Sequence, residues 1–333
     1  MCYPTSIYLK ENSMLSPEIQ TAPISTVDKP HCLSQPRNRI VLATIATLLW
    51  GSAFPMVKLG YASIAIAHND TFKQLLYAGY RFTLAGIFLL FLSTVIYPTT
   101  WIFNRDKLVR VVRVGSVQTF LQYIFFYIGL ALASGISGAI VASSVTFFQL
   151  LIAHLLFTDD KLSRRRLISA LIGFCGIGFY HVMEHGWRLG MGMGEGLMLV
   201  AMLSGAYGNI LSKRNVHKTL PVLTLTAWQM FAGGLGLVIV GASQAGWMPF
   251  QWNIYSSAIL IYLALLSAMA FLLWNLLMVH NQVGKISVFL FLIPNFGVCL
   301  SALILGEPLH WYIAPALAMI MIGIFMANTS ARR

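Results

Sequence analysis

Residues 75–92, LLYAGYRFTLAGIFLLFL, decide the class of fold. The stretch holds a single charged side chain, Arg81, inside an apolar run that approaches the roughly 20 residues needed to cross a lipid bilayer. A charged group at the centre of a bilayer costs roughly 3 kcal/mol on insertion scales. We therefore expect Arg81 to face the interior of a bundle of membrane-spanning helices, and not the lipid.

The composition of the whole chain agrees with a membrane setting. Hydrophobic residues make up 58% of the sequence and charged residues 10%, whereas a soluble domain is about 25% charged. The net charge is +12, but the basic residues lie between apolar runs, where they act as topology signals. We therefore expect the lipid bilayer as a partner and expect no nucleic acid.

Ten apolar runs are predicted to be membrane-spanning helices, which makes the fold class all-α integral membrane. Very short connections such as LASGIS and GEPLH force neighbouring runs into antiparallel hairpins. The ten predicted runs are 40–60, 75–97, 109–131, 137–157, 167–183, 194–212, 221–242, 254–276, 285–305 and 310–328.

The first residues of the chain differ in character from the rest. Residues 1–37 are polar, contain several prolines and show no apolar core or cleavage site, so we expect a disordered cytoplasmic tail and not a signal peptide. The remainder divides into a first five-helix repeat, 38–183, and a second, 184–330.

The distribution of basic residues predicts the orientation in the membrane. If the N-terminus is cytoplasmic, 18 of the 22 Lys and Arg residues fall on the cytoplasmic side. Only Lys58, Lys73 and Arg188 fall outside, and Arg81 is assigned to neither side. Cytoplasmic loops carry such an excess of basic residues, so we expect a multi-pass protein of the cell (inner) membrane with both termini in the cytoplasm.

The sequence also contains an internal repeat. A shift of 147 positions brings Tyr127 onto Trp274 and aligns TDDKLS (158–163) with LGEPLH (305–310), and a shift of 148 brings Arg81 onto Gln229. Because each repeat has an odd number of helices, the second copy enters the membrane upside down. Such inverted repeats are typical of secondary transporters that bind substrate near the membrane midplane.

Three segments carry a family resemblance. LLWGSAFPMVKL (48–59) and GYRFTLAG (79–86) resemble the first two helices of EamA-type proteins in the drug/metabolite transporter superfamily. LIPNFGVCLSALILGEPLHWYIAPALAMIMIGIFM (292–326) is similar to the last two helices of that family. The resemblance covers about residues 40–328 and implies a ten-helix metabolite transporter with both ends cytoplasmic, often an exporter.

The first repeat departs from the family pattern. Phe147 stands where the second repeat has Pro294, and Asp160 and Lys161 replace the Glu-Pro pair of the last turn. The turn is therefore degenerate in one half, and we assign it no role in transport.

Amide and aromatic side chains supply the candidate substrate site. Gln118 and Gln122 lie four residues apart and so occupy one stripe of a helix, and Tyr123 and Tyr127 repeat this spacing on the adjacent stripe. Amides and aromatic rings suit a small polar metabolite, although polar side chains also bridge membrane helices. The candidate substrate-binding residues are Trp50, Arg81, Gln118, Gln122, Tyr123, Tyr127, Gln149, Tyr207, Asn209, Gln229, Trp274, Asn275 and Asn295.

Two interpretations of Arg81 stay open at this point. Its planar guanidinium is suited to holding a substrate carboxylate or phosphate. Alternatively, it donates to backbone carbonyls freed near Pro55 in the first helix. Pro55 and Pro294 are the predicted hinge or kink positions.

The expected function is a secondary transporter, in the exporting direction, of small polar organic metabolites such as amino acids or related compounds, working by alternating access. The alternative is an integral membrane enzyme such as an acyl or glycosyl transferase, but no cluster of catalytic or metal-binding residues is apparent.

We expect no cofactor and no metal ion. Every acidic residue lies in the tail, a loop or a helix end. The substrate, the coupling ion and the pairing of the chain into a homodimer stay open.

Overall fold

A computed structural model describes residues 33, 35–97, 105–156, 164–186 and 192–328. Over those ranges the chain forms helices and no strand. The first half contains α1 (Pro36–Ser63), α2 (Thr71–Ile96), α3 (Arg105–Gly115), the π-helical η3 (Ser116–Leu121), α4 (Gln122–Leu132), α5 (Gly135–Ala142), α6 (Ser144–Leu156) and α7 (Arg164–His185). The second half contains α8 (Met193–Thr219), α9 (Val222–Ala245), α10 (Ile254–His280), α11 (Val283–Ser287), the 3₁₀-helical η4 (Val288–Phe291), α12 (Leu292–Leu305) and α13 (Ile313–Asn328).

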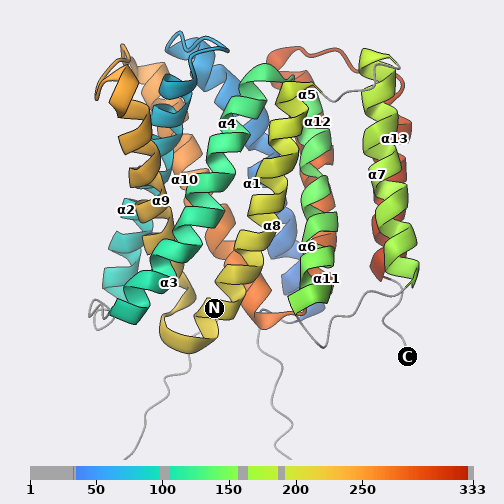
Figure 1. Cartoon of the computed structure of the whole chain (residues 1–333), viewed down its shortest axis with the longest axis horizontal. Helices are drawn as coiled ribbons and strands as arrows, with labels where there is room; N and C mark the ends of the chain where they lie inside the picture. Colours follow the sequence, from blue (N-terminus) through green and yellow to red (C-terminus); the bar gives the residue numbers. More distant parts are fainter. Residues whose placement is uncertain (1–32, 34, 98–104, 157–163, 187–191, 329–333) are drawn as a thin grey trace, which may run out of the picture.

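Over the described ranges these elements join into ten helical segments that stand side by side, as many as the predicted spans (Figure 1). Seven of the segments are long and apolar enough to cross a membrane, and α7 and α13 contain shorter apolar stretches, Leu171–Glu184 and Ile313–Gly323. Three of the segments consist of more than one helix: α3, η3 and α4 form one, α5 and α6 another, and α11, η4 and α12 the third. The ends differ from the predicted runs by a few residues. The first helix begins at Pro36 and not at residue 40, because proline is well tolerated in the first turn, where its missing N–H has no helical partner.

The two halves run in opposite directions. In Figure 1, α1 begins at the lower face of the bundle, whereas α8, which opens the second half, begins at the upper face. The end of α13 returns to the lower face, where α1 starts. The five-helix halves are therefore inverted copies, as the odd number of helices per repeat predicts.

The packing of the helices follows the same symmetry. The first helix of one repeat, α1, packs against α10 and α12 of the other, and its counterpart α8 packs against α4 and α6. The second helices, α2 and α9, pack on each other, and so do the fifth helices, α7 and α13. Each half therefore contributes the same set of contacts, and the core is formed between the repeats.

Two glycines show this symmetry at atomic detail. A Cβ atom at Gly86 in α2 would lie 2.5 Å from the backbone nitrogen of Phe231 in α9, and one at Gly234 in α9 would lie 2.5 Å from that of Thr83 in α2. A shift of 148 positions carries Gly86 to Gly234 and Thr83 to Phe231. Both contacts need glycine because the two backbones approach too closely for any side chain.

The fourth span of each repeat is interrupted near its middle. In the first repeat α5 and α6 are separated at Ser143, and in the second repeat α11 gives way to η4 before α12. A shift of 147 positions places Ser143 opposite Leu290, inside η4. Pro294 contributes to the second interruption because its missing N–H leaves the Leu290 carbonyl without its helical donor. By contrast, α1 continues as one helix through Pro55.

Candidate substrate-binding site

A cavity of about 60 Å³ lies between the two repeats at mid-length positions of their helices. By the measure in which one water needs roughly 10–15 Å³, it has room for a few water molecules. Both interrupted spans reach it, through Ala142 and Val145 in one repeat and through Leu290 and Ile293 in the other. The remaining lining residues are Trp50, Ala53, Phe54, Arg81, Gln122, Tyr123, Phe126, Met202, Gly205, Asn209 and Phe271.

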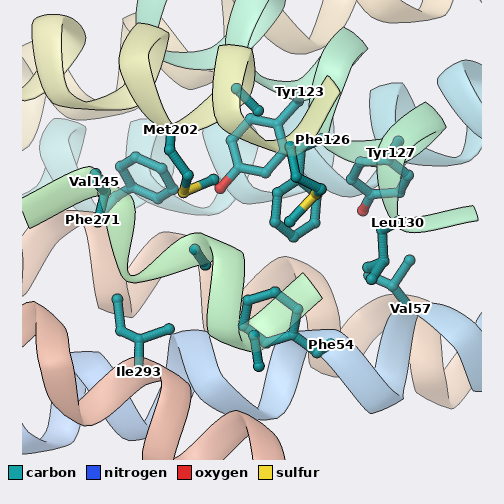
Figure 2. Close-up of a cluster of buried hydrophobic side chains, with 14 of the residues drawn as sticks. Phe54, Val57, Tyr123, Phe126, Tyr127, Leu130, Val145, Met202, Phe271 and Ile293 are labelled. Carbon is teal, nitrogen blue, oxygen red and sulfur yellow. The ribbon is translucent and has the colours of Figure 1, made fainter. Parts of the chain in front are cut away.

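Aromatic rings from several helices form the walls. Figure 2 shows the ring of Phe126 of α4 between those of Phe54 of α1 and Tyr123, with Met202 beyond Tyr123 at the upper left of the view. The ring of Trp50 packs edge-on against Phe271, with a centroid distance of 5.3 Å, and lies 5.4 Å from the ring of Trp274. Such rings offer flat apolar surfaces to a ligand.

Arg81 lies in this wall with only 1% of its surface exposed. Its Nε donates to the carbonyl of Leu263 at 3.1 Å and to the hydroxyl of Ser267 at 2.6 Å, both in α10. Its Nη1 donates to the hydroxyl of Tyr127 at 3.0 Å. The guanidinium therefore faces the bundle interior, as the cost of a charge in lipid predicts.

The alternative in which Arg81 donates to backbone carbonyls near Pro55 is wrong. The guanidinium does bind a backbone carbonyl, but that carbonyl belongs to Leu263 in the eighth span. The reason is the packing of α2, which contacts α9, α10 and α4 much more extensively than α1. Arg81 thus connects the first repeat to the second.

In the described part of the chain, the hydrogen-bond partners of Arg81 include no carboxylate. Leu263, Ser267 and Tyr127 supply neutral oxygen atoms, and the cavity lining contains no aspartate or glutamate. A ring also touches the guanidinium, because Cζ of Arg81 lies 5.0 Å from the centroid of Phe82. A buried charge is costly unless an opposite charge or several hydrogen bonds compensate for it, and here three hydrogen bonds to neutral oxygen atoms do so.

A chain of amide hydrogen bonds crosses the boundary between the repeats. Nε2 of Gln118 donates to Oδ1 of Asn209 at 2.7 Å, and Nδ2 of Asn209 donates to Oε1 of Gln149 at 2.9 Å. Nε2 of Gln149 then donates to the hydroxyl of Ser287 at 2.7 Å. These four side chains are buried, and Asn209 also lines the cavity.

Two further hydrogen bonds join helices behind the cavity. The hydroxyl of Thr119 donates to Oε1 of Gln229 at 2.8 Å, and Nδ2 of Asn275 donates to the hydroxyl of Thr226 at 3.0 Å. The hydroxyl partners in these pairs, like Ser267 and Ser287, were absent from the predicted set. The repeat offers a signal for one of them, because the shift of 148 that places Arg81 on Gln229 also places Thr119 on Ser267.

The structure places the predicted site residues in three groups. The residues that line the cavity are Trp50, Arg81, Gln122, Tyr123 and Asn209. The residues that are buried behind the lining and contact other buried side chains are Gln118, Tyr127, Gln149, Gln229, Trp274 and Asn275. The other two lie away from the lining: Tyr207 is 36% exposed, and Nδ2 of Asn295 donates to the Phe291 carbonyl at 2.7 Å.

Carboxylates join the repeats at the upper face of the bundle. Oε1 and Oε2 of Glu307 accept from the backbone N–H groups of Gly135 and Ile136, each at 2.8 Å. The hydroxyl of Ser137 donates to Oε1 of Glu195 at 2.8 Å. These bonds hold the first turn of α5 against the second repeat, and the negative charge of Glu307 suits the N-terminus of that helix. The repeat counterpart of Glu307, Asp160, lies outside the described residues.

A third carboxylate belongs to the same face. The hydroxyl of Tyr312 donates to Oε2 of Glu184 at 2.6 Å and joins the connection before α13 to the end of α7. Burial and this hydrogen bond together raise the pKa of Tyr312 to about 12. The phenol therefore stays protonated at physiological pH and remains a donor to Glu184.

The model of the EamA-like transporter family matches residues 38–181 and again residues 192–329. The chain belongs to the EamA-like transporter family. The two matches follow the two inverted halves of the structure, so each half is one family unit. Both matched ranges contribute residues to the cavity.

Known proteins of similar sequence are transporters by name. The chain is 23% identical over 304 residues to the uncharacterized transporter YvbV of Bacillus subtilis, covering 90% of this chain and 94% of that protein. It is 24% identical over 298 residues to a probable amino-acid metabolite efflux pump of Salmonella typhimurium, covering 86% and 93% of the two chains. A solved crystal structure matches with a TM-score of 0.66 at 17% identity over 89% of this chain and 99% of that one, which shows the shared fold.

Proposed function

We propose that this multi-pass membrane transporter exports small organic metabolites related to amino acids and works by alternating access. The observation that carries the proposal is the cavity between two inverted repeats, which both interrupted spans reach at mid-length. Interrupted helices at a repeat interface are where secondary transporters bind substrate. The volume of about 60 Å³ is small for such a metabolite, so binding requires the walls to separate.

The chemistry of the lining supports an amino-acid-related substrate. Arg81 supplies a cation for a carboxylate, Gln122 and Asn209 supply amides, and the aromatic walls accept an apolar side chain. The name of the Salmonella relative, "probable amino-acid metabolite efflux pump", agrees with this chemistry and with the outward direction. We propose the candidate residues that line the cavity as the substrate contacts.

The orientation belongs to the same proposal. With 18 of the 22 basic residues on one side, the positive-inside tendency places both termini in the cytoplasm of a cell whose inner membrane holds the protein. A cysteine in place of Met248, which is 88% exposed on the connection between α9 and α10, then reacts with a membrane-impermeant maleimide added to intact cells. A cysteine in place of exposed Val109 near the start of α3 stays protected. The reverse pattern contradicts the orientation.

Flux through the purified protein tests the function. Liposomes that contain the full chain are loaded with a mixture of amino acids and their N-acetyl, methyl and thioether derivatives, and the release of each compound is followed by mass spectrometry. We expect release of at least one of them well above that from protein-free liposomes. Its loss in an Arg81→Gln variant that remains folded would tie transport to this cavity. Liposomes that release none of the compounds faster than protein-free controls contradict the proposal.

A further inference from the structure

The polar atoms of the cavity form a set that selects substrate by charge. Of the residues that line it, all within the described part of the chain, Arg81 alone carries a formal charge. Each polar group offered by the remaining lining residues belongs to a neutral amide, indole or phenol. An occupant with one negative charge would bring the net charge of this enclosed space to zero.

Two unpartnered polar atoms on lining residues suit a ligand of this kind. The indole Nε1 of Trp50 and the amide Oε1 of Gln122 are buried without a hydrogen-bond partner in the described part of the chain, and both residues line the cavity. The indole can only donate, which suits a carboxylate oxygen, and the amide oxygen can only accept, which suits an N–H group. Buried polar groups normally have partners, so these atoms point to a ligand that satisfies both.

We infer that the preferred substrates are monocarboxylates with an apolar or aromatic body and an uncharged N–H, such as N-acylated amino acids, in preference to free zwitterionic amino acids. This inference rests on the proposed transport function and specifies its substrate. The carboxylate binds Arg81 and the indole of Trp50, and the amide N–H binds Gln122. The body lies among Phe54, Phe126 and Phe271.

The charge of the site disfavours the other candidates. The free ammonium group of an amino acid would lie near the guanidinium of Arg81 with no carboxylate in the lining, and like charges repel strongly where water is excluded. A dicarboxylate or a phosphate ester would leave one negative charge against the aromatic walls, where no second cation lies. A neutral compound would leave the positive charge of Arg81 with neutral hydrogen-bond partners alone.

Four compounds with one aromatic body separate these cases. Liposomes with the full chain are tested for uptake of N-acetylphenylalanine, phenylalanine, N-acetylphenylalanine amide and phenylsuccinate, which carry a single negative charge, a zwitterion, no charge and two negative charges. We expect uptake of N-acetylphenylalanine to exceed that of the others at least tenfold. Uptake of phenylalanine, the neutral amide or phenylsuccinate at an equal or higher rate would overturn the inference, while leaving transport itself established.

A charge-changing variant gives an independent test in the same liposomes. Gln122→Glu keeps the size of the side chain and adds a carboxylate to the cavity, so the ratio of phenylalanine to N-acetylphenylalanine uptake should rise at least tenfold. An unchanged ratio in a folded Gln122→Glu protein would overturn the inference. Asp70→Asn changes a charge in the Asp70–Lys73 ion pair at the start of α2, outside the cavity lining, and should leave the ratio as it is.

Binding measured without flux keeps the two proposals distinguishable. The same four compounds are added to the detergent-solubilised protein, and the thermal unfolding midpoint is recorded, because a ligand that binds the folded state raises it. A rise with N-acetylphenylalanine alone, together with no flux, would support the charge preference and contradict transport. No rise and no uptake with N-acetylphenylalanine would overturn the inference.

Discussion

The side chains of Arg81 and Ser267 are joined by a hydrogen bond of 2.6 Å that crosses from the first repeat to the second. A second hydrogen bond, from Thr119 to Gln229 at 2.8 Å, also has its donor in the first repeat and its acceptor in the second. A shift of 148 positions exchanges the members of the two pairs. The same cross-repeat bond therefore occurs twice in the duplicated chain. The guanidinium of Arg81 takes part in one copy, and the neutral amide of Gln229 takes the equivalent position in the other. Of these two residues, the charged one, Arg81, is the one that lines the cavity.

Replacing Arg81 by glutamine should impair both stability and transport. The change leaves Ser267 and Tyr127 without their charged donor, and hydrogen bonds to a charged group contribute roughly 1.5–3 kcal/mol. We expect a loss of that order in the free energy of unfolding in detergent and at least a tenfold loss of flux in liposomes. Arg164→Ala, at an exposed position at the start of α7, should change neither. Full stability and full flux in Arg81→Gln would contradict the position assigned to the guanidinium.

The glycines between α2 and α9 should be equally intolerant of a side chain in both repeats. Valine at Gly86 would overlap the backbone of Phe231, and valine at Gly234 would overlap that of Thr83. Overpacking of this kind costs about 1–3 kcal/mol. We expect similar decreases in the thermal unfolding midpoint for the two variants. Gly178→Val, where a Cβ meets no other atom within 4 Å, is the matched control. A large difference between Gly86→Val and Gly234→Val would argue against equivalent contacts.

The number of spans and their inversion could be predicted from the sequence because they depend on quantities that a chain carries locally. An apolar run fixes the length of a span, and an odd number of spans per repeat fixes the inversion. The burial of Arg81 follows from the same reasoning, since the cost of a charge in lipid means that its side chain has to point into the interior of the bundle. These predictions need no knowledge of which helix is the neighbour.

The partners of the buried residues could not be predicted in this way. One of the two interpretations of Arg81 had it bond near Pro55, whereas it bonds to Leu263, because the choice depends on which helix packs beside α2. Gln118 lies in the π-helical turn η3, whose wider turn changes the direction of the side chains that follow it. Nothing in SVQTFL signals that turn. Tyr207 lies two residues before Asn209, so on a helix the two point in different directions, and only Asn209 reaches the cavity lining.

The amide chain between the repeats should show measurable coupling. Gln149 donates to Ser287 at 2.7 Å, and each residue is fully buried. We expect a double-mutant cycle with Gln149→Leu and Ser287→Ala to give a coupling energy between about 0.6 and about 1.7 kcal/mol, the average and the maximum found for side-chain hydrogen bonds between membrane helices. Unfolding in detergent by a denaturing surfactant measures each term.

A second cycle serves as the control for this coupling. Ser243 lies on α9 and its hydroxyl donates only to the Val240 carbonyl of its own helix. Pairing Ser243→Ala with Gln149→Leu should therefore give additive effects, as distant sites usually do. Additivity in the Gln149–Ser287 cycle as well would show that the hydrogen bond contributes no coupling between the repeats.

Glu307 should keep the upper face of the bundle closed. Its two oxygens accept from Gly135 and Ile136 at the start of α5, and α5 ends at Ala142 in the cavity wall. Glu307→Gln removes the charge and one acceptor, so the first turn of α5 separates from the second repeat more often. We expect a cysteine at position 142, in a chain whose native cysteines are replaced by serine, to react several times faster with a small maleimide in the Glu307→Gln background. Asp70→Asn, which affects an ion pair within one helix, should leave the labelling rate unchanged. A rate unaffected by Glu307→Gln would mean that this carboxylate does not hold the two repeats together.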